Sequence, residues 1–311
     1  MSAREGIVIE GTGGVWQVRD HDGQQYAAAL AGRLKQEERA KVKLAVGDHV
    51  TIEPEERGQG WRITAIAERR TVLSRREPGG RHGERIVAAN VDQVLVVFAV
   101  AKPEPHIRMI DRFLVVCEAN DLEAHVVFNK VDLAADEVVI ASLAAPYRAA
   151  GYAVHLTSVK RGDGLGELRQ VLHGRVTAVT GPSGVGKSSL LNTLHPGVAL
   201  RTAEISESVN KGRHTTVGAK LIALPDGDDG YLVDTPGLRE VGMWGLPSES
   251  LDQCFPEFRP FLGTCRFQDC KHDSEPECAV RREVGAGALD AGRYESYLKL
   301  LAELHLSERV R

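Results

Sequence analysis

The sequence predicts a multidomain protein with an N-terminal all-β barrel, a central α/β domain and a C-terminal, mainly helical metal-binding domain. Short β-type segments separated by turn residues fill the chain up to about Leu73. From Val91 onward, Val-rich apolar strands alternate with helical stretches, which is typical of a parallel sheet covered on both faces. Nearer the C-terminus, three cysteines and a histidine lie between Cys265 and Cys278.

The composition is that of a soluble globular protein. The 311 residues suffice for about two domains of ~150 residues, and 42% of them are hydrophobic and 26% charged. The longest apolar run, residues 94–101, is far shorter than the ~20 residues of a membrane span, and the opening MSAREGIVIE contains no apolar signal segment. We therefore expect a cytoplasmic protein with no membrane partner. Because the net charge is -4, any nucleic-acid partner must be bound by local basic patches.

The first 73 residues are predicted to form a small barrel. Residues 15–18, 49–52 and 61–64 have β-type composition, and turns containing glycine separate them. This pattern fits an OB-fold and an SH3-like barrel equally well. The next segment, residues 74–85, is rich in arginine and is predicted to be a basic linker. It is either a strip that contacts phosphates or a solvated connection whose charges only keep it soluble.

A phosphate-binding loop follows the apolar strand predicted at residues 176–180. The pattern GxxxxGK[ST] is matched without exception by Gly181, Pro182, Ser183, Gly184, Val185, Gly186, Lys187 and Ser188, and Ser189 continues into the helix. The glycines let backbone NH groups turn toward phosphates, and the helix N-terminus adds its positive dipole end. Lys187 is expected to reach the β and γ phosphates and Ser188 to bind Mg²⁺.

A second nucleotide motif ends the strand predicted at residues 231–233. It reads Asp234-Thr235-Pro236-Gly237, a DxxG pattern. We expect the carboxylate of Asp234 to hold Mg²⁺ through water and the NH of Gly237 to sense the γ-phosphate.

A third motif identifies the base. After the strand at residues 125–128 comes an NKxD sequence, consisting of Asn129, Lys130, Val131 and Asp132. The carboxylate of Asp132 can accept two hydrogen bonds from guanine, whereas adenine would leave a desolvated charge unpaired. Lys130 can lie across the base. The TSVK sequence that contains Ser158 resembles a loop that contacts guanine in GTPases. These residues predict a GTP/GDP site and disfavour an ATP-using kinase.

The order of the motifs is unusual. In Ras-like GTPases the phosphate loop comes first and NKxD last, whereas here NKVD and TSVK precede the phosphate loop and DTPG follows it. The sequence therefore predicts a circularly permuted GTPase domain, an arrangement that keeps the sheet and its site if the old termini are close in space.

With these motifs, the chain resembles the ribosome small subunit-dependent GTPase A family (RsgA/YjeQ) over nearly its whole length. The resemblance implies an OB-fold domain at 1–73, the basic linker at 74–85, the permuted GTPase domain at 86–242 and a zinc-binding domain at 243–311. It also implies a GTP phosphohydrolase that binds the 30S ribosomal subunit with its 16S rRNA, assists late subunit maturation and is stimulated by the ribosome. We expect a monomer.

The segment between the phosphate loop and DTPG must contain the first switch. It includes His214, Thr215 and Thr216, and one of the two threonines should complete the Mg²⁺ shell. The residue after DTPG is Leu238, which cannot orient a water molecule as the glutamine of Ras-like enzymes does. His214 is therefore our candidate for positioning the attacking water, and the alternatives are loop packing or an RNA contact.

The cysteine cluster suits a closed zinc site. Its thiolates and imidazole come from Cys265, Cys270, His272 and Cys278, within fourteen residues. We expect one structural zinc ion without a catalytic role, and the alternative is buried cysteines that bind no metal. Cys117 and Cys254 are expected to pack as small apolar side chains.

Two functions remain in competition at this point. The first is GTP hydrolysis that times docking on the 30S subunit and release from it. The second is an RNA-binding ribosome-assembly scaffold for which GTP is only a conformational ligand, and the leucine at position 238 keeps this alternative open.

Overall fold

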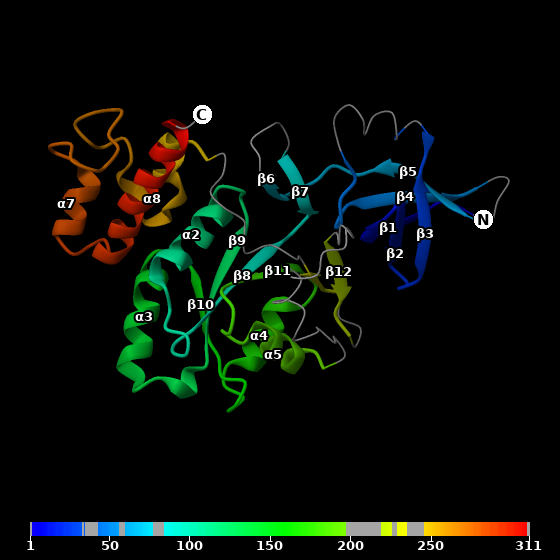
Figure 1. Ribbon diagram of the computed structural model, residues 1–311, viewed down its shortest axis with the longest axis horizontal. Helices are drawn as coiled ribbons and strands as arrows, with labels where there is room; N and C mark the ends of the chain where they lie inside the picture. Colours follow the sequence, from blue (N-terminus) through cyan, green and yellow to red (C-terminus); the bar gives the residue numbers. More distant parts are fainter. Residues whose placement is uncertain are drawn as a thin grey trace. The chain divides into compact units, whose positions relative to one another are not determined.

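The computed structural model describes residues 2–32, 34, 43–55, 60–76, 84–196, 219–225, 229–234 and 246–309 (Figure 1). The chain forms two compact units. The first contains Met1–Gln93, Arg169–Val179 and Ser188–Glu240, and the second contains Val94–Leu168, Thr180–Lys187 and Val241–Arg311. Each unit is described by itself.

The first unit begins with a closed barrel, as the sequence predicts. Its strand order is β1-β2-β3-β5-β4, and the strands are β1 (Arg4–Thr12), β2 (Val15–Asp20), β3 (Gln25–Leu30), β4 (His49–Pro54) and β5 (Trp61–Ile66). Alternate residues of these strands point inward and form one apolar core that includes Val8, Val18, Ile52 and Ile63. The buried carboxylate of Asp48, just before β4, accepts a hydrogen bond from Arg69 Nε at 2.6 Å.

The segment predicted as a linker contains strands. Strand β6 (Val72–Arg76) pairs antiparallel with β7 (Glu84–Ala89), and Arg75 lies opposite Arg85 in this ladder. Residues 77–83, which include Arg81, lie outside the described residues. The Glu-Pro-Gly-Gly sequence predicts an interruption of regular secondary structure. From sequence alone, a turn between paired strands cannot be distinguished from an open linker.

The central sheet, as far as it is described, has six strands in the order β10-β9-β8-β11-β13-β12. The first unit contributes β12 (Lys220–Ala223) and β13 (Tyr231–Asp234), which are antiparallel, and β11 (Val176–Thr180), which is parallel to β13. Helix α5 (Lys187–Leu194) follows β11 and buries its leucines.

The second unit contains the rest of the sheet. Strand β8 (Gln93–Ala99) is buried along its whole length, which explains its unbroken apolar sequence. Helix α2 (Ile107–Glu118) leads to β9 (Glu123–Asn129), and the short helix η1 (Val131–Leu133) and α3 (Glu137–Ala149) lead to β10 (Ala153–Leu156) and α4 (Leu165–Leu172). Helix α3 begins at the capping residue Asp136, whose side chain accepts a hydrogen bond from the NH of Val139.

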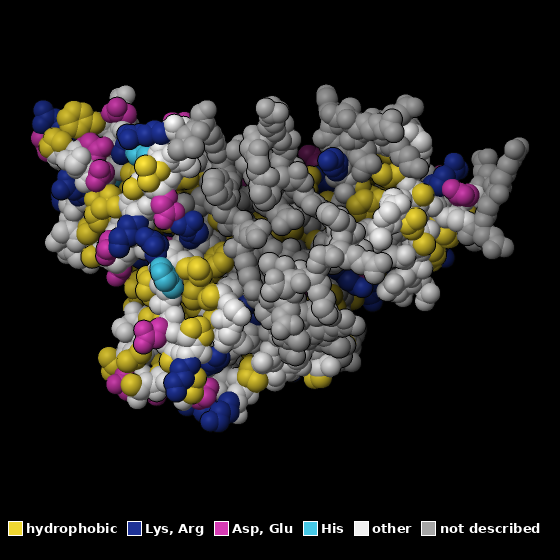
Figure 2. All heavy atoms as spheres, in the orientation of Figure 1, with side chains coloured by type: hydrophobic (Ala, Val, Ile, Leu, Met, Phe, Trp, Pro, Cys, Tyr) yellow, Lys and Arg dark blue, Asp and Glu magenta, His cyan; other side chains and the backbone are white. Residues whose placement is uncertain are grey.

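The C-terminal part of the second unit is mainly helical. Short 3₁₀ helices η3 (Ser248–Ser250), η4 (Asp252–Cys254) and η5 (Pro256–Phe261) precede α7 (Ala279–Gly285) and α8 (Ala291–Arg309). Phe255, Phe258 and Tyr297 pack together between them. Figure 2 shows basic and acidic side chains interspersed over the face of these elements. Arg259 on η5 forms an ion pair with Glu118 on α2.

A buried cation joins α8 to the GTPase-type elements. Arg293 is 2% exposed and donates hydrogen bonds from Nη1 to Asp111 Oδ1 at 2.7 Å and from Nε to Glu257 Oε1 at 2.7 Å. Its guanidinium also lies 4.8 Å from the ring centre of Phe255 and 5.6 Å from that of Tyr147. Because Asp111 lies on α2 and Tyr147 on α3, the C-terminal helices are fixed to the α2 and α3 side of this unit.

Among the residues that the structure describes, no helix combines the length and apolar composition that crossing a membrane requires.

The two cysteines outside the cluster, Cys117 and Cys254, are both buried, as expected. Burial raises the pKa of the Cys117 thiol to about 12.

We predict that Arg293→Met destabilises the second unit. The substitution leaves Asp111 and Glu257 without their counter-charge, and loss of one partner from a buried ion pair costs about 3–5 kcal/mol. Urea unfolding followed by circular dichroism measures the change. The control is Lys299→Met on the same helix, which removes an exposed pair with Glu295 and should cost less than about 0.5 kcal/mol. Equal effects of the two variants would contradict the prediction.

Candidate functional site

The guanine motif and the TSVK loop begin side by side. Strands β9 and β10 are parallel, and Phe128 pairs with Leu156 at their carboxyl ends. The two loops therefore leave the same edge of the sheet. Backbone hydrogen bonds continue the pairing, because the NH of Val131 donates to the carbonyl of Thr157 at 3.1 Å.

Asn129 connects three loops. Its side chain is buried, and Nδ2 donates to the carbonyl of Val185 in the phosphate loop at 2.9 Å. Its Oδ1 accepts a hydrogen bond from Thr157 Oγ1 at 3.1 Å. The phosphate loop approaches this amide closely, since a Cβ added to Gly186 would lie 2.6 Å from Nδ2, and Gly186 has a φ of 93°. This position therefore requires glycine.

Lys130 makes a second connection to the phosphate loop. Its backbone is left-handed, with a φ of 61°, and its Nζ donates to the carbonyls of Gly184 and Lys102, both at 2.6 Å. The aliphatic stem is thereby held beside the loop. A stem in this position can cover one face of a flat ring.

Asp132 is held by the neighbouring loop. Ser158 Oγ, which is buried, donates to Asp132 Oδ1 at 2.6 Å and accepts from the NH of Arg161 at 3.1 Å. The hydrogen bond from Ser158 lowers the pKa of Asp132 below its ordinary value, and the positive charges of Lys160 and Arg161 act in the same direction. The carboxylate is therefore ionised at neutral pH and accepts hydrogen bonds only.

The phosphate loop lies between β11 and α5, as the sequence predicts. Gly181 has a φ of 136°, and a Cβ there would lie 2.0 Å from the carbonyl oxygen of Val97, so no other residue fits. Lys187, the first residue of α5, donates from Nζ to the carbonyls of Gly181 and Pro182 at 2.8 and 2.7 Å. The ammonium is thus held inside the loop.

The structure brings most of the predicted nucleotide residues together in the second unit. Asn129, Lys130, Asp132 and Ser158 surround the loop from Gly181 to Lys187 through the contacts given above. Val131 is buried at the start of η1. The remaining described residues of the prediction belong to the first unit, where Ser188 and Ser189 continue α5 and Asp234 ends β13.

Four predicted residues lie outside the described residues: His214, Thr215, Thr216 and Gly237. Conversely, sequence reasoning did not name Arg161, whose NH donates to Ser158, or Lys102, whose carbonyl accepts from Lys130. Lys102 contributes only a backbone carbonyl, for which side-chain identity gives no signal.

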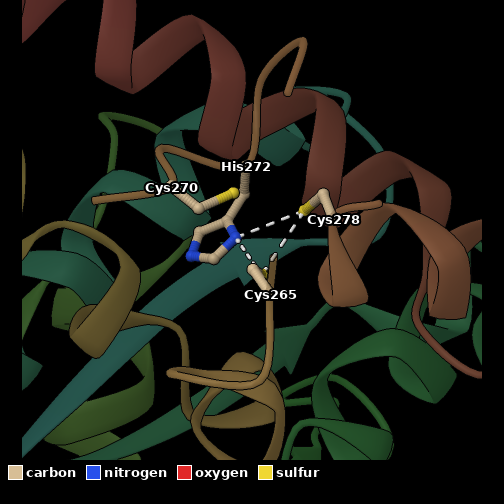
Figure 3. A group of neighbouring side chains, drawn as sticks. All are labelled: Cys265, Cys270, His272 and Cys278. Carbon is tan, nitrogen blue, oxygen red and sulfur yellow. Dashed lines mark hydrogen bonds between the residues drawn. The ribbon is translucent and has the colours of Figure 1, made fainter. Parts of the chain in front are cut away.

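The four predicted zinc ligands form a compact cluster (Figure 3). The ligand atoms of Cys265, Cys270, His272 and Cys278 all lie within 4.8 Å of one another. The sulfur atoms of Cys265 and Cys278 are 3.9 Å apart, and His272 Nδ1 lies 3.6 and 3.4 Å from them. A tetrahedral zinc ion with Zn–S bonds of about 2.3 Å places two sulfurs about 3.8 Å apart and a sulfur and a nitrogen about 3.6 Å apart. The donor set and its spacing fit zinc.

The surroundings of the cluster orient its histidine. His272 Nδ1 faces the sulfurs, while Nε2 lies 3.4 Å from Asp252 Oδ2, the arrangement in which a carboxylate fixes the tautomer of a metal-binding imidazole. The carbonyl of His272 accepts a hydrogen bond from the hydroxyl of Tyr294 at 2.7 Å.

The thiols differ in acidity. Burial opposes ionisation of Cys265, but hydrogen bonds from the NH of Ala279 and from the other thiols outweigh it and lower its pKa. Burial raises the pKa of Cys270 to about 12. Metal binding at this cluster must therefore displace a proton from Cys270 at neutral pH.

Taken together, the fold and these sites define a circularly permuted GTPase domain combined with an N-terminal barrel and a C-terminal Cys₃His module. A family model described as RsgA GTPase matches residues 66–244, and one described as RsgA N-terminal domain matches residues 5–61. The chain belongs to the RsgA GTPase family.

Curated relatives cover nearly the whole chain. A protein of Gemmatimonas aurantiaca named small ribosomal subunit biogenesis GTPase RsgA is 57% identical over 300 residues, which are 96% of this chain and 97% of the relative. A protein of the same name from Moorella thermoacetica is 40% identical over 305 residues, covering 98% of this chain and 99% of the relative.

Solved structures also resemble this fold. YjeQ from Thermotoga maritima matches with a TM-score of 0.81 and 35% identity, covering 97% of this chain and 99% of that one. YloQ, whose structure is described as a circularly permuted GTPase, matches with a TM-score of 0.76 and 29% identity, covering 98% and 96%.

We predict that Ser158→Ala weakens guanine nucleotide binding and changes its pH dependence. Without the Ser158 hydroxyl, the pKa of Asp132 rises toward its ordinary value, so affinity is lost at a higher pH on acidification than in the wild type. Near neutral pH the affinity should fall about threefold to tenfold, the value of one net hydrogen bond. Titrations with fluorescent GDP at several pH values measure both effects. Ser142→Ala, an exposed serine on α3, is the control, and superimposable acid limbs would refute the prediction.

We also predict that the cluster binds one zinc ion per chain and that Cys270→Ser loses it. Removal of one thiolate from a closed four-ligand site leaves an incomplete coordination shell, and folding of the module is coupled to the metal. Elemental analysis of the purified protein gives the stoichiometry. Cys254→Ser, a cysteine outside the cluster, should keep the metal, and a wild-type protein without stoichiometric zinc would exclude the site.

Proposed function

We propose that the protein is a GTP phosphohydrolase that binds the 30S ribosomal subunit and assists its late maturation, with hydrolysis stimulated by the subunit. One observation carries the nucleotide part of this proposal. Two side chains of the NKVD motif donate hydrogen bonds to carbonyls of the phosphate loop, Asn129 to Val185 and Lys130 to Gly184. A base bound at Asp132 and phosphates bound at the loop therefore belong to one molecule. The names of the relatives support the ribosomal part.

Each group has a defined task in this proposal. Asp132 accepts hydrogen bonds from guanine, and the ionised carboxylate rejects adenine because no donor pair is offered to it. The backbone NH groups of residues 181–189, except Pro182, which has none, and the ammonium of Lys187 bind the phosphates. Mg²⁺ supplies charge neutralisation on the phosphates when bound, and its ligands are Ser188, either Thr215 or Thr216, and Asp234 through water, while Gly237 senses the γ-phosphate.

His214 is proposed to position the attacking water once the ribosome orders the first switch. The proposal rests on the sequence, because Leu238 occupies the place of the usual glutamine and offers no hydrogen bond.

The other domains are proposed to bind the subunit. The barrel, an OB-fold in this proposal, and the zinc module contact 16S rRNA, and the zinc ion gives the module rigidity without taking part in catalysis. We propose that the protein acts in the cytoplasm as a monomer, with domains at 1–73, 86–242 and 243–311 and the arginine-rich segment at 74–85 between the first two.

Single-turnover GTP hydrolysis with and without 30S subunits tests the function. We expect slow hydrolysis by the protein alone and an acceleration of roughly 100-fold or more with 30S subunits, within the range that activating partners give to GTPases. His214→Ala should lose this acceleration while its affinity for GTP stays unchanged, because the switch histidine acts on water rather than on the base.

Two results would count against the proposal. Unchanged hydrolysis in the presence of 30S subunits would favour the scaffold for which GTP is only a conformational ligand. Full stimulation of His214→Ala would assign that histidine to loop packing or to an RNA contact. Competition between GTP and ATP for binding checks the base specificity in the same preparation.

A further inference from the structure

The barrel contacts the hairpin of β12 and β13, within the first unit. Lys220 Nζ on β12 lies 2.9 Å from Glu10 Oε2 on β1. Arg19 on β2 donates a hydrogen bond to the hydroxyl of Tyr231 at 3.4 Å, and its guanidinium lies 5.7 Å from the centre of that ring. Both strands of the hairpin therefore meet the barrel through charged side chains.

A β-bulge directs Glu10 out of the barrel. In a regular strand, Val8 and Glu10 would face the same side because they are two residues apart. The pairing of β1 with β2 shifts register between these two residues, which interrupts that alternation. Val8 is fully buried in the barrel core, whereas the side chain of Glu10 is 42% exposed. The bulge thus allows the carboxylate to reach Lys220.

Lys220 is also the direct neighbour of Asp234. The two residues lie opposite each other in the antiparallel pairing of β12 with β13. Opposite residues share one face of the sheet, with Cβ atoms about 4.5–5.5 Å apart. Desolvation by burial raises the pKa of Asp234 above its ordinary value, and the charge of Lys220 opposes part of this rise.

We propose that Lys220 couples the barrel to the magnesium site, because its ammonium pairs with Glu10 while the residue itself lies opposite Asp234 in the β12–β13 ladder. The inference rests on the proposed function, in which Asp234 holds Mg²⁺ through water. An ammonium beside Asp234 opposes the binding of a second cation, and Glu10 weakens this opposition by attracting the ammonium toward the barrel. A basic group of a partner that binds Glu10 returns Lys220 to Asp234 and weakens Mg²⁺ binding without touching the nucleotide.

Two single substitutions test the coupling, because they should move Mg²⁺ affinity in opposite directions. Lys220→Met removes the opposing charge and lowers the Mg²⁺ concentration at which GTP retention is half-maximal. Glu10→Gln removes the carboxylate that attracts the ammonium of Lys220 toward the barrel. The ammonium then opposes Mg²⁺ binding at Asp234 more strongly, and this Mg²⁺ concentration rises. We expect shifts of about twofold to fivefold, the range for exposed ion pairs, and smaller shifts at high salt. Release of a fluorescent GTP analogue, recorded over a Mg²⁺ titration, gives the values.

The controls separate this coupling from other effects. Glu5→Gln removes a carboxylate from the same strand and should leave the titration unchanged. In an Asp234→Asn background, Lys220→Met should have no effect. Shifts of both variants in the same direction, no shift in either, or a persistent effect without the Asp234 carboxylate would overturn the coupling. GTP retention that is independent of Mg²⁺ in the wild type would instead contradict the proposed function.

Discussion

The candidate nucleotide site depends on two side chains that hydrogen-bond to backbone carbonyls. Asn129 Nδ2 and Lys130 Nζ donate to Val185 and Gly184, so the end of β9 fixes the phosphate loop. Backbone carbonyls cannot be removed by substitution, and the loop can approach the amide only because Gly186 has no side chain. In the proposed function, with guanine at Asp132 and phosphates at the loop, the distance between the two is therefore set before the nucleotide binds. Preorganisation of this kind reduces the entropy lost on binding.

The same contacts explain why the permuted motif order is physically acceptable. The site uses the spatial proximity of β9, β10 and the phosphate loop, and their order along the chain does not affect any of these hydrogen bonds. What permutation changes is the location of the connections between domains. In this chain the barrel and the β6–β7 hairpin precede β8, and the metal module follows the segment that begins with Asp234.

Local patterns in the sequence were enough to predict the barrel, the α/β sheet and the four-residue metal cluster, because periodicity, glycine-rich turns and ligand spacing are local properties. Contacts formed by the backbone or across distant segments were not predictable. Strand β3 was not singled out, because its QYAAAL sequence has little β-branched character, and the pairing of β6 with β7 gave no local signal in the arginine-rich segment. Buried Arg293 gave no signal, since its partners Asp111 and Glu257 are distant in the sequence.

Two of the described cations, Arg293 and Lys220, illustrate how burial decides what a charge can do. Arg293 is desolvated, so its partners cannot be exchanged for water without a cost of several kcal/mol, and the contact can only be kept or lost. Lys220 is half exposed, and an ion pair in that environment is worth about 1 kcal/mol or less. An interaction this weak contributes little to stability, but it can be redistributed between two carboxylates by a partner. The difference in solvent exposure therefore predicts a fixed contact at Arg293 and an exchangeable contact at Lys220.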